Sequence, residues 1–256
     1  MKIIQVTDLH LGAERPKPGD PDPMLSFDLA LDDIAMRHSD ADLLVLTGDL
    51  SEHGETECYE AIRTRMTSVR SPYALLIGNH DDRGNFARIF PEHLDELGFV
   101  QGARDLPIGR AIFLDTHQPG HHYGTLCETR LAWLRRELSA HPGPFWIFMH
   151  HNPIPTHLPL IDRIMLNDRA NFANLIEEFA QKIAYIFHGH LHLPMSGALA
   201  GVPVHCPRGT STAGYPNYGE DSLLPASGLP SSYSVIISDG RETTVMMVEY
   251  GWQGAN

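Results

Sequence analysis

Ala74-Leu75-Leu76-Ile77-Gly78-Asn79-His80-Asp81 is the stretch of this sequence that decides the fold. Four apolar residues end at a glycine, and three side chains that can bind a metal ion, a proton or a phosphate follow immediately. Strands of parallel sheets are near-continuous apolar runs, because helices cover both faces of such sheets. Ligands of these proteins bind beyond the carboxyl ends of the strands. The stretch therefore predicts a buried strand that ends in a functional site.

The same arrangement occurs five times along the chain. Each copy is an apolar run of strand length, followed directly by carboxylate, amide or imidazole side chains. Because the carboxyl ends of neighbouring parallel strands meet at one edge of a sheet, we expect these side chains to converge. They are Asp8, His10, Asp49, Asn79, His80, His150, His190 and His192.

Helical periodicity separates these strands. Apolar residues recur at helical spacing over 25–37, 55–69, 85–90, 129–138 and 171–179. Alternating strands and helices are typical of an α/β fold with a parallel sheet. The sequence therefore predicts this fold class for the region up to residue 192.

After residue 192 the pattern changes. Antiparallel strands are expected over 202–204, 233–238 and 243–250. A loop rich in Gly, Pro and Ser is expected over 215–230. The simplest organisation is one domain over 1–256, with a motif-bearing core at 1–195 and antiparallel strands at 196–250.

Composition excludes several classes of protein. The chain has 256 residues, and none of its apolar runs approaches the roughly 20 residues that cross a membrane. Its N-terminus becomes polar too soon for a secretion signal. The three cysteines form no Cys-x-x-Cys pair, which fits a reducing compartment. The net charge of −13 disfavours a nucleic-acid polymer as partner. We therefore expect a cytoplasmic protein that does not bind membranes.

The eight converging side chains predict metal binding. Two are carboxylates and six are imidazoles or amides. A mixed set of nitrogen and oxygen ligands suits Fe, Mn, Zn or Co better than Mg or Ca, which prefer oxygen alone. Eight donors exceed what one ion needs, so two divalent or trivalent ions are expected. Asp49, from a middle strand, is the natural bridge between them.

The motifs also carry a family resemblance. In order and spacing they resemble the motif set of calcineurin-like metallophosphoesterases, and within that family the small bacterial phosphodiesterases that cleave cyclic nucleotides or glycerophosphodiesters. The resemblance implies a four-layer αββα sandwich, in which helices flank two mixed sheets. It also implies that Asp49 is shared by two ions, one with Asp8, His10 and His192 and the other with Asn79, His150 and His190. The motifs are Asp8-x-His10, Gly48-Asp49, Gly78-Asn79-His80-Asp81, His150 and Gly189-His190-x-His192.

The implied reaction is hydrolysis of a small phosphodiester by attack of a metal hydroxide on phosphorus. His80 would face the substrate beside Asn79, and would stabilise the transition state or protonate the leaving group. Asp81 could orient the His80 ring. Thr212 stands where glycerophosphodiesterase-like members have a histidine near the phosphate, so it is a candidate substrate contact without that charge.

The sequence leaves several alternatives open. Cyclic nucleotides are slightly favoured as substrates over glycerophosphodiesters. A phosphomonoesterase could use the same site, and a non-catalytic metal-binding scaffold could share the fold. The C-terminal strands could pair copies of the chain into a homo-oligomer.

Some neighbouring residues are expected to play no part in the site. His151 and His188 adjoin candidate ligands, but side chains alternate along a strand, so both should point elsewhere. Arg83 is expected on the surface rather than against a phosphate. His117, His121 and His122 lie in a Gly/Pro-rich loop that is either solvated surface or a flank of the substrate.

Overall fold

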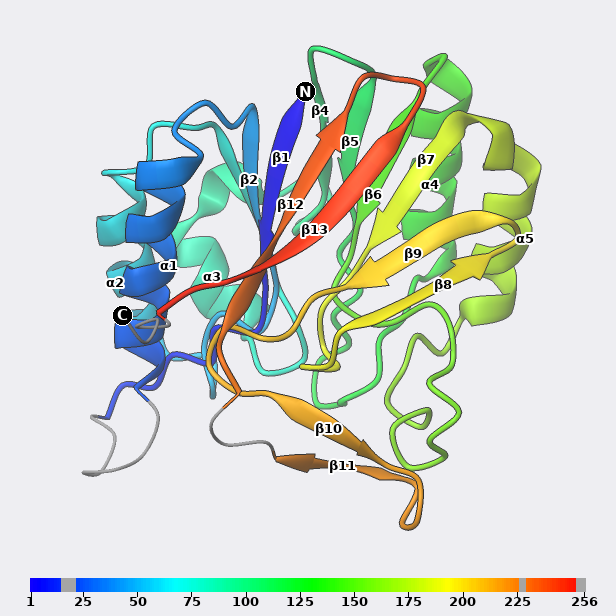
Figure 1. Ribbon diagram of the computed structural model, residues 1–256. Helices are drawn as coiled ribbons and strands as arrows, with labels where there is room; N and C mark the ends of the chain where they lie inside the picture. Colours follow the sequence, from blue (N-terminus) through cyan, green and yellow to red (C-terminus); the bar gives the residue numbers. More distant parts are fainter. Residues whose placement is uncertain (15–21, 226–228, 252–256) are drawn as a thin grey trace.

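Two β-sheets packed face to face form the middle of the molecule, and helices cover the outer face of each (Figure 1). The computed structural model describes residues 1–14, 22–225 and 229–251. The four layers are those of the expected αββα sandwich, and the predicted fold class is confirmed.

The first sheet has five strands in the order β13-β12-β1-β2-β3. β1, β2 and β3 run parallel, and β12 and β13 are antiparallel to their neighbours, so the sheet is mixed. α1, α2 and α3 lie on its outer face (Figure 1). The bounds are β1 (Lys2–Val6), α1 (Pro23–Arg37), β2 (Leu43–Thr47), α2 (Thr56–Met66), β3 (Tyr73–Leu76), α3 (Arg83–Ile89), β12 (Ser232–Ser238) and β13 (Thr243–Glu249).

The second sheet has six strands in the order β4-β5-β6-β7-β9-β8. β5, β6, β7 and β9 run parallel, whereas the two edge strands β4 and β8 are antiparallel to their neighbours. α4 and α5 cover the outer face (Figure 1). The bounds are η1 (Pro91–His93), β4 (Gly102–Asp105), β5 (Arg110–Phe113), α4 (Glu128–Ala140), β6 (Phe145–Phe148), α5 (Arg169–Phe179), η2 (Ala180–Lys182), β7 (Ile183–Phe187), β8 (Met195–Leu199) and β9 (Val202–Cys206).

Three apolar layers explain why the central strands are mostly apolar. Side chains alternate along each strand, so β1 sends Ile4 to the helices and Ile3 to the space between the sheets. In the same way β6 buries Ile147 against the outer helices and Trp146 between the sheets. Because both faces of each sheet are covered, both sets of positions are mostly apolar. Gln5 of β1 is a buried exception, and its amide donates to His188 O (2.9 Å).

The expected loop at 215–230 is wrong over much of its length. β10 (Gly214–Asn217) and β11 (Ser222–Pro225) form a two-stranded hairpin that projects from the sandwich below β8 and β9 in Figure 1. Residues 226–228 of that stretch lie outside the described residues, as do 15–21 near the N-terminus. Pattern reading misses a short hairpin of this kind because it buries no continuous apolar run.

Two edge strands and one strand direction also differ from the expectation. β4 and β8 were not predicted, because an edge strand is partly exposed and polar, as Arg104 and Asp105 of β4 illustrate. The strand expected to be antiparallel over 202–204 is Val202–Cys206, which is antiparallel to β8 but parallel to β7. Among the described residues, no helix has the length and apolar character needed to cross a membrane.

Candidate metal centre

The predicted side chains come together where the strands of both sheets end. Asp8 follows β1, Asp49 follows β2, and His150 and His190 follow β6 and β7 of the other sheet. Within each sheet, backbone bonds join neighbouring loops, since the Asp8 N–H donates to Gly48 O (3.1 Å) and the Gly189 N–H to His150 O (3.0 Å). Between the sheets, the His190 N–H donates to Oδ1 of Asp8 (3.0 Å). The site therefore lies across the seam between the two sheets.

The backbone is strained at this seam. A residue other than glycine with positive φ costs on the order of 1–3 kcal/mol and persists only where its surroundings enforce it. Five of the predicted ligands have such angles, and each of them follows the end of an apolar strand. They are Asp8 (φ 56°), His10 (48°), Asp49 (49°), His190 (72°) and His192 (53°).

One group of side chains contains all four residues expected around the first ion. Ligand-type atoms of Asp8, His10, Asp49 and His192 all lie within 4.8 Å of one another. Nε2 of His10 is 2.9 Å from Nε2 of His192 and 3.5 Å from Oδ2 of Asp49. Nε2 of His192 is 3.7 Å from Oδ1 of Asp8.

A second group adjoins the first through Asp49. Oδ2 of Asp49, which faces His10, is also 3.3 Å from Nε2 of His150. That nitrogen is 3.2 Å from Oδ1 of Asn79, and the His150 and His190 rings lie 5.1 Å apart. Asp49 thus stands between the two groups, as a bridging ligand would.

These donors fit a pair of cations. Oδ2 of Asp8 is buried and has no hydrogen-bond partner among the described residues. Buried polar atoms without partners are costly, and two close imidazole nitrogens facing carboxylates call for positive charge between them. The mixture of nitrogen and oxygen atoms suits a transition metal.

The pKa values of the site show the same demand for positive charge. Burial opposes ionisation of Asp49, but His150, His10 and His80 hold its pKa well below the ordinary value. Burial opposes protonation of His150, but Asp49, Asp8 and the contact with Thr47 O together outweigh it and raise the pKa of His150 to about 9. Burial lowers the pKa of His190 and His192, which are therefore neutral and able to act as ligands at neutral pH.

The outer nitrogens of three imidazoles are fixed by other residues. Nδ1 of His150 is 2.8 Å from Thr47 O, and Nδ1 of His10 is 2.6 Å from Oε2 of Glu52. Nδ1 of His192 contacts Oγ1 of Thr212. Such contacts fix the tautomer and turn Nε2 towards the site.

Two of these partners change the picture drawn from the sequence. Thr212 was expected to contact the substrate phosphate, but its hydroxyl faces the His192 ring. Glu52 was not predicted at all. A carboxylate three residues after Asp49, on the turn that leaves the same strand end, was the available signal.

His80 lies at the mouth of the site. Its backbone N–H donates to Oδ1 of Asp49 (3.0 Å), and its ring centroid is 4.7 Å from that of His10. The side chain is 28% exposed, so it faces both the metal ligands and the space that a substrate would enter. Nδ1 of His80 is 2.9 Å from the backbone oxygen of Glu52.

The expectation that Asp81 orients the His80 ring is wrong. Oδ2 of Asp81 accepts hydrogen bonds from the N–H groups of Leu50 (3.1 Å) and Gly78 (2.8 Å). Oδ1 accepts from the Ser51 N–H (3.0 Å) and the Tyr59 hydroxyl (2.9 Å). Burial and nearby Asp49 raise the pKa of Asp81 to about 6. Asp81 therefore ties the turn after β2 to the turn after β3.

Gly78 has no room for a side chain. A Cβ atom built on it would overlap Oδ1 of Asp49 and reach 2.5 Å from Nε2 of His150. The glycine that precedes the Asn-His-Asp motif therefore allows β3 to approach the two central ligands.

The loop after β5 forms one wall of the mouth. Nδ2 of Asn79 is 3.3 Å from Nδ1 of His122, whose ring is 5.9 Å from that of His80. His121 stacks on Tyr123 instead, with ring centroids 4.6 Å apart. His117 is buried, with Nδ1 2.8 Å from Gly78 O. The loop therefore flanks the substrate space through His122.

Arg83 does not reach into this space. Its guanidinium makes two contacts of 2.9 Å with the buried carboxylate of Asp115, at the end of β5. Arg130 donates to Asp115 O (2.7 Å) and lies on the same Phe99 ring as Arg83. This network joins α3 to the second sheet.

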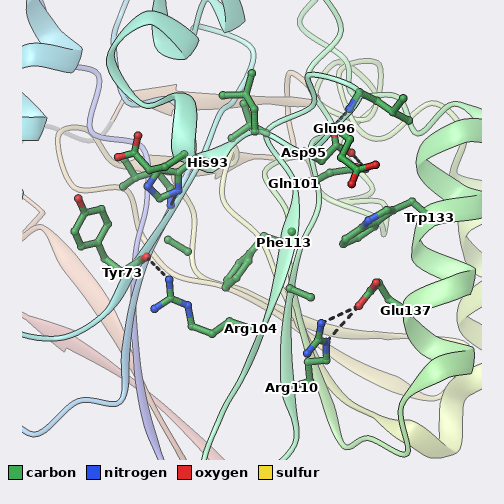
Figure 2. Close-up of a pocket in the computed structure, with 18 of the residues that line it drawn as sticks. Tyr73, His93, Asp95, Glu96, Gln101, Arg104, Arg110, Phe113, Trp133 and Glu137 are labelled. Carbon is green, nitrogen blue, oxygen red and sulfur yellow. Dashed lines mark hydrogen bonds and ion pairs between the residues drawn. The ribbon is translucent and has the colours of Figure 1, made fainter.

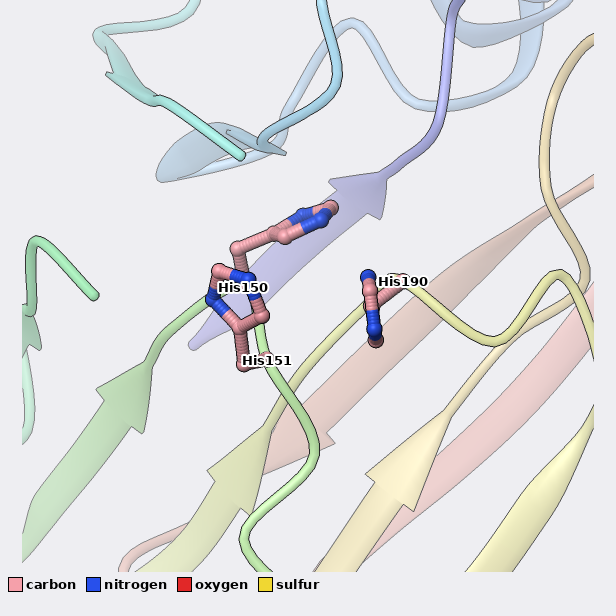
Figure 3. Close-up of side chains that lie close together, drawn as sticks. All are labelled: His150, His151 and His190. Carbon is pink, nitrogen blue, oxygen red and sulfur yellow. The ribbon is translucent and has the colours of Figure 1, made fainter. Parts of the chain in front are cut away.

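His151 also differs from its expected place. It was expected to point away from the site, yet its ring nitrogen lies within 4.8 Å of those of His150 and His190. Figure 3 shows the three rings gathered beyond the ends of β6 and β7. Nδ1 of His188, in contrast, is 2.9 Å from Gly189 O.

A cavity of about 1230 Å³ lies elsewhere, among the start of β3, β4 and α4 (Figure 2). The residues that line it include none of the proposed metal ligands. Two of its arginines have partners, since Arg104 donates to Tyr73 O (3.4 Å) and Arg110 to Glu137 (3.1 Å). These contacts join the sheet edges to each other and to α4. The cavity is therefore separate from the convergence of ligands.

Comparison with known proteins gives a consistent result. The family described as calcineurin-like phosphoesterase matches residues 1–194. A Rhodopseudomonas palustris protein named a probable cyclic nucleotide phosphodiesterase is 32% identical over 260 residues, covering 99% of this chain and 94% of its own length. The glycerophosphodiester phosphodiesterase GpdQ of Enterobacter lignolyticus is 33% identical over 156 residues, 59% of this chain and 56% of its own.

Solved structures support the fold alone. The purple acid phosphatase PPD1 from yellow lupin has a TM-score of 0.66 and 11% sequence identity. The match covers 97% of this chain and 51% of that one.

Proposed function

This chain belongs to the calcineurin-like phosphoesterase family, and on that premise we propose that it is a phosphodiesterase with two metal ions that hydrolyses small diesters. The observation that carries the proposal is the place of Asp49, whose Oδ2 lies 3.5 Å from His10 and 3.3 Å from His150. Asp8, His10, Asp49 and His192 would hold one ion. Asp49, Asn79, His150 and His190 would hold the other.

Ions held there would polarise the phosphoryl oxygens and supply a hydroxide nucleophile from water at neutral pH. Fe, Mn and Zn fit the donor set, and Co is possible. The protein's own contribution is to orient the substrate and move a proton. His80 faces the mouth, and its Nδ1–H donates to Glu52 O. In its imidazolium form it also carries a proton at Nε2, which it would give to the leaving oxygen.

Asn79 and His122 would orient the phosphate, since they lie side by side at the mouth. Imidazole and amide groups can donate hydrogen bonds without carrying a fixed charge. Arg83, which follows the His80 motif, brings no positive charge to the phosphate because it is paired with Asp115. A diester carries one negative charge and needs less compensation than a doubly charged monoester. This favours a diesterase over a phosphomonoesterase.

Among diesters, we place 3′,5′-cyclic nucleotides slightly ahead of glycerophosphodiesters. The relative named for cyclic nucleotides aligns along nearly the whole chain, whereas the one named for glycerophosphodiesters aligns with 59% of it. Thr212 supports the same order, because it brings no imidazole to the phosphate and is engaged with His192.

The test is turnover of a chromogenic phosphodiester and its monoester, using protein stripped with a chelator and refilled with Mn²⁺. We expect Mn²⁺ to restore diester cleavage with little monoester cleavage. Cyclic nucleotides and glycerophosphodiesters are then compared on the same sample. Dominant monoester cleavage would make the protein a phosphatase. Two bound ions without turnover of the diester or the monoester would leave a metal-binding scaffold.

The cellular setting is part of the proposal. Cys58, Cys127 and Cys206 are free thiols, which fits a reducing cytoplasm. β13 is an edge strand of the first sheet, so copies of the chain could pair through the C-terminal strands.

A further inference from the structure

We propose that His151 is a positioning residue, which acts through His190 to set the affinity for the second ion. The inference rests on the proposed binuclear site. It concerns a residue outside the predicted ligand set.

An imidazole ligand has two nitrogens, and the one that does not bind the ion needs a partner within the protein. His10, His150 and His192 have such partners in Glu52, Thr47 O and Thr212. Nε2 of His190 is buried and has none among the described residues. His190 is thus the incomplete member of the set.

His151 offers the missing partner. Its ring centroid is 4.8 Å from that of His190, and both side chains come from strand ends in the second sheet (Figure 3). Nε2 of His151 is also buried and lacks a hydrogen-bond partner within the described chain. Two neighbouring rings with one unsatisfied nitrogen each become satisfied when one donates to the other. His190 then presents Nδ1 to the ion.

The surroundings of His151 are built to hold its ring. Nδ1 lies 2.7 Å from Oγ1 of Thr116, and the side chain is completely buried. A Cβ atom on Gly124 would overlap the His151 ring, so glycine leaves the necessary space. Thr116 is fixed in turn, because its backbone oxygen accepts from the Thr125 N–H (2.9 Å). The ring is therefore held by the loop after β5.

The experiment measures metal binding to the full chain with Mn²⁺ alone, by titration calorimetry and by electron paramagnetic resonance of the coupled pair. Wild-type protein is expected to bind two ions. His151→Leu should bind one ion normally and the other about 10–100-fold more weakly, with loss of the coupled signal. His151→Gln retains a hydrogen-bonding group and should lose less affinity for that ion than His151→Leu. Thr116→Val should weaken the same ion.

The matched control is His188→Leu. His188 is also fully buried, and its Nε2 has no hydrogen-bond partner in the described parts of the chain, but it is not in the His150–His151–His190 group. This variant should keep both ions at wild-type affinity. Two ions bound normally by His151→Leu would overturn the inference, as would equal losses in the two leucine variants. A wild-type protein that binds fewer than two ions would overturn the binuclear proposal itself.

Discussion

Nδ1 of His10 lies 2.6 Å from Oε2 of Glu52, a residue only three positions after Asp49. The same residue accepts at its backbone oxygen from the His80 ring, so Glu52 joins a ligand of the first ion to the proposed proton donor. Burial lowers the pKa of His10, but Glu52 and Asp49 reverse this effect and raise it. The carboxylate thus makes His10 a more basic ligand.

Replacing Glu52 with Gln should weaken the first metal site. The loss of charge behind His10 should lower metal affinity or activity about 10–100-fold. Mn²⁺ titration and diester turnover at several metal concentrations measure this loss. Glu57→Gln, at an exposed position on α2, is the control and should behave like wild type. Unchanged metal affinity in Glu52→Gln would show that Glu52 does not support His10 as a ligand.

Replacing His80 with Ala should impair catalysis but not metal binding. Removal of a general acid typically lowers kcat by about 10²–10⁴-fold. Two ions should still bind, because His80 is not among the proposed ligands. Metal analysis and kcat on the same sample provide the check, with His53→Ala, an exposed neighbour, as control. Wild-type turnover by His80→Ala would contradict the assignment.

Replacing His122 with Ala should raise KM for the diester. Losing one hydrogen bond to a charged phosphate should cost about 1.5–3 kcal/mol of binding free energy, which raises KM roughly 10–100-fold. The matched control is His121→Ala, since that exposed neighbour stacks on Tyr123 rather than facing Asn79. Steady-state kinetics with a chromogenic diester distinguish them. Equal KM values for the two variants would place His122 outside the substrate site.

Replacing Asp81 with Asn should lower stability. The carboxylate accepts four hydrogen bonds, and the amide would direct two hydrogens at groups that are themselves donors. We expect a loss of about 2–4 kcal/mol in the free energy of unfolding, measured with a denaturant. Asp40→Asn, which removes an exposed pairing with Lys2, should lose less than about 1 kcal/mol.

His93 should make the metal-free protein less stable in acid. Burial lowers its pKa from 6.5 to about 4, and Nδ1 accepts from the Leu75 N–H (3.4 Å). Below about pH 6.5 the unfolded chain takes up this proton and the folded chain does not. The contribution of His93 is therefore complete above pH 6.5 and is lost as the pH falls to 4.

Unfolding in chelator between pH 7 and pH 4, compared with His93→Gln, tests this dependence. The stability advantage of wild type over the variant should shrink by about 2–3 kcal/mol across the range. A difference that stays constant would exclude His93 as the titrating group.

The sequence by itself determined the central strands and the place of the site. A strand covered on both faces has to be apolar at successive positions, so runs such as Leu43–Thr47 and Phe145–Phe148 are recognisable without any tertiary information. The polar residues that follow them can be located for the same reason. Edge strands such as β4 and β8 were not predicted, because partly exposed strands lack a continuous apolar run.

Only the tertiary structure decided which partner each side chain meets. Asp81 is adjacent to His80 in the chain, yet its carboxylate is directed at Tyr59 and the turn after β2. His151 and Thr212 meet His190 and His192 through loops that are distant in sequence. The left-handed backbone at Asp8 and Asp49 turns side chains in directions that strand alternation does not describe. Sequence periodicity fixes which face of a regular element is buried, whereas beyond the strand ends the direction of a side chain depends on contacts between the two sheets.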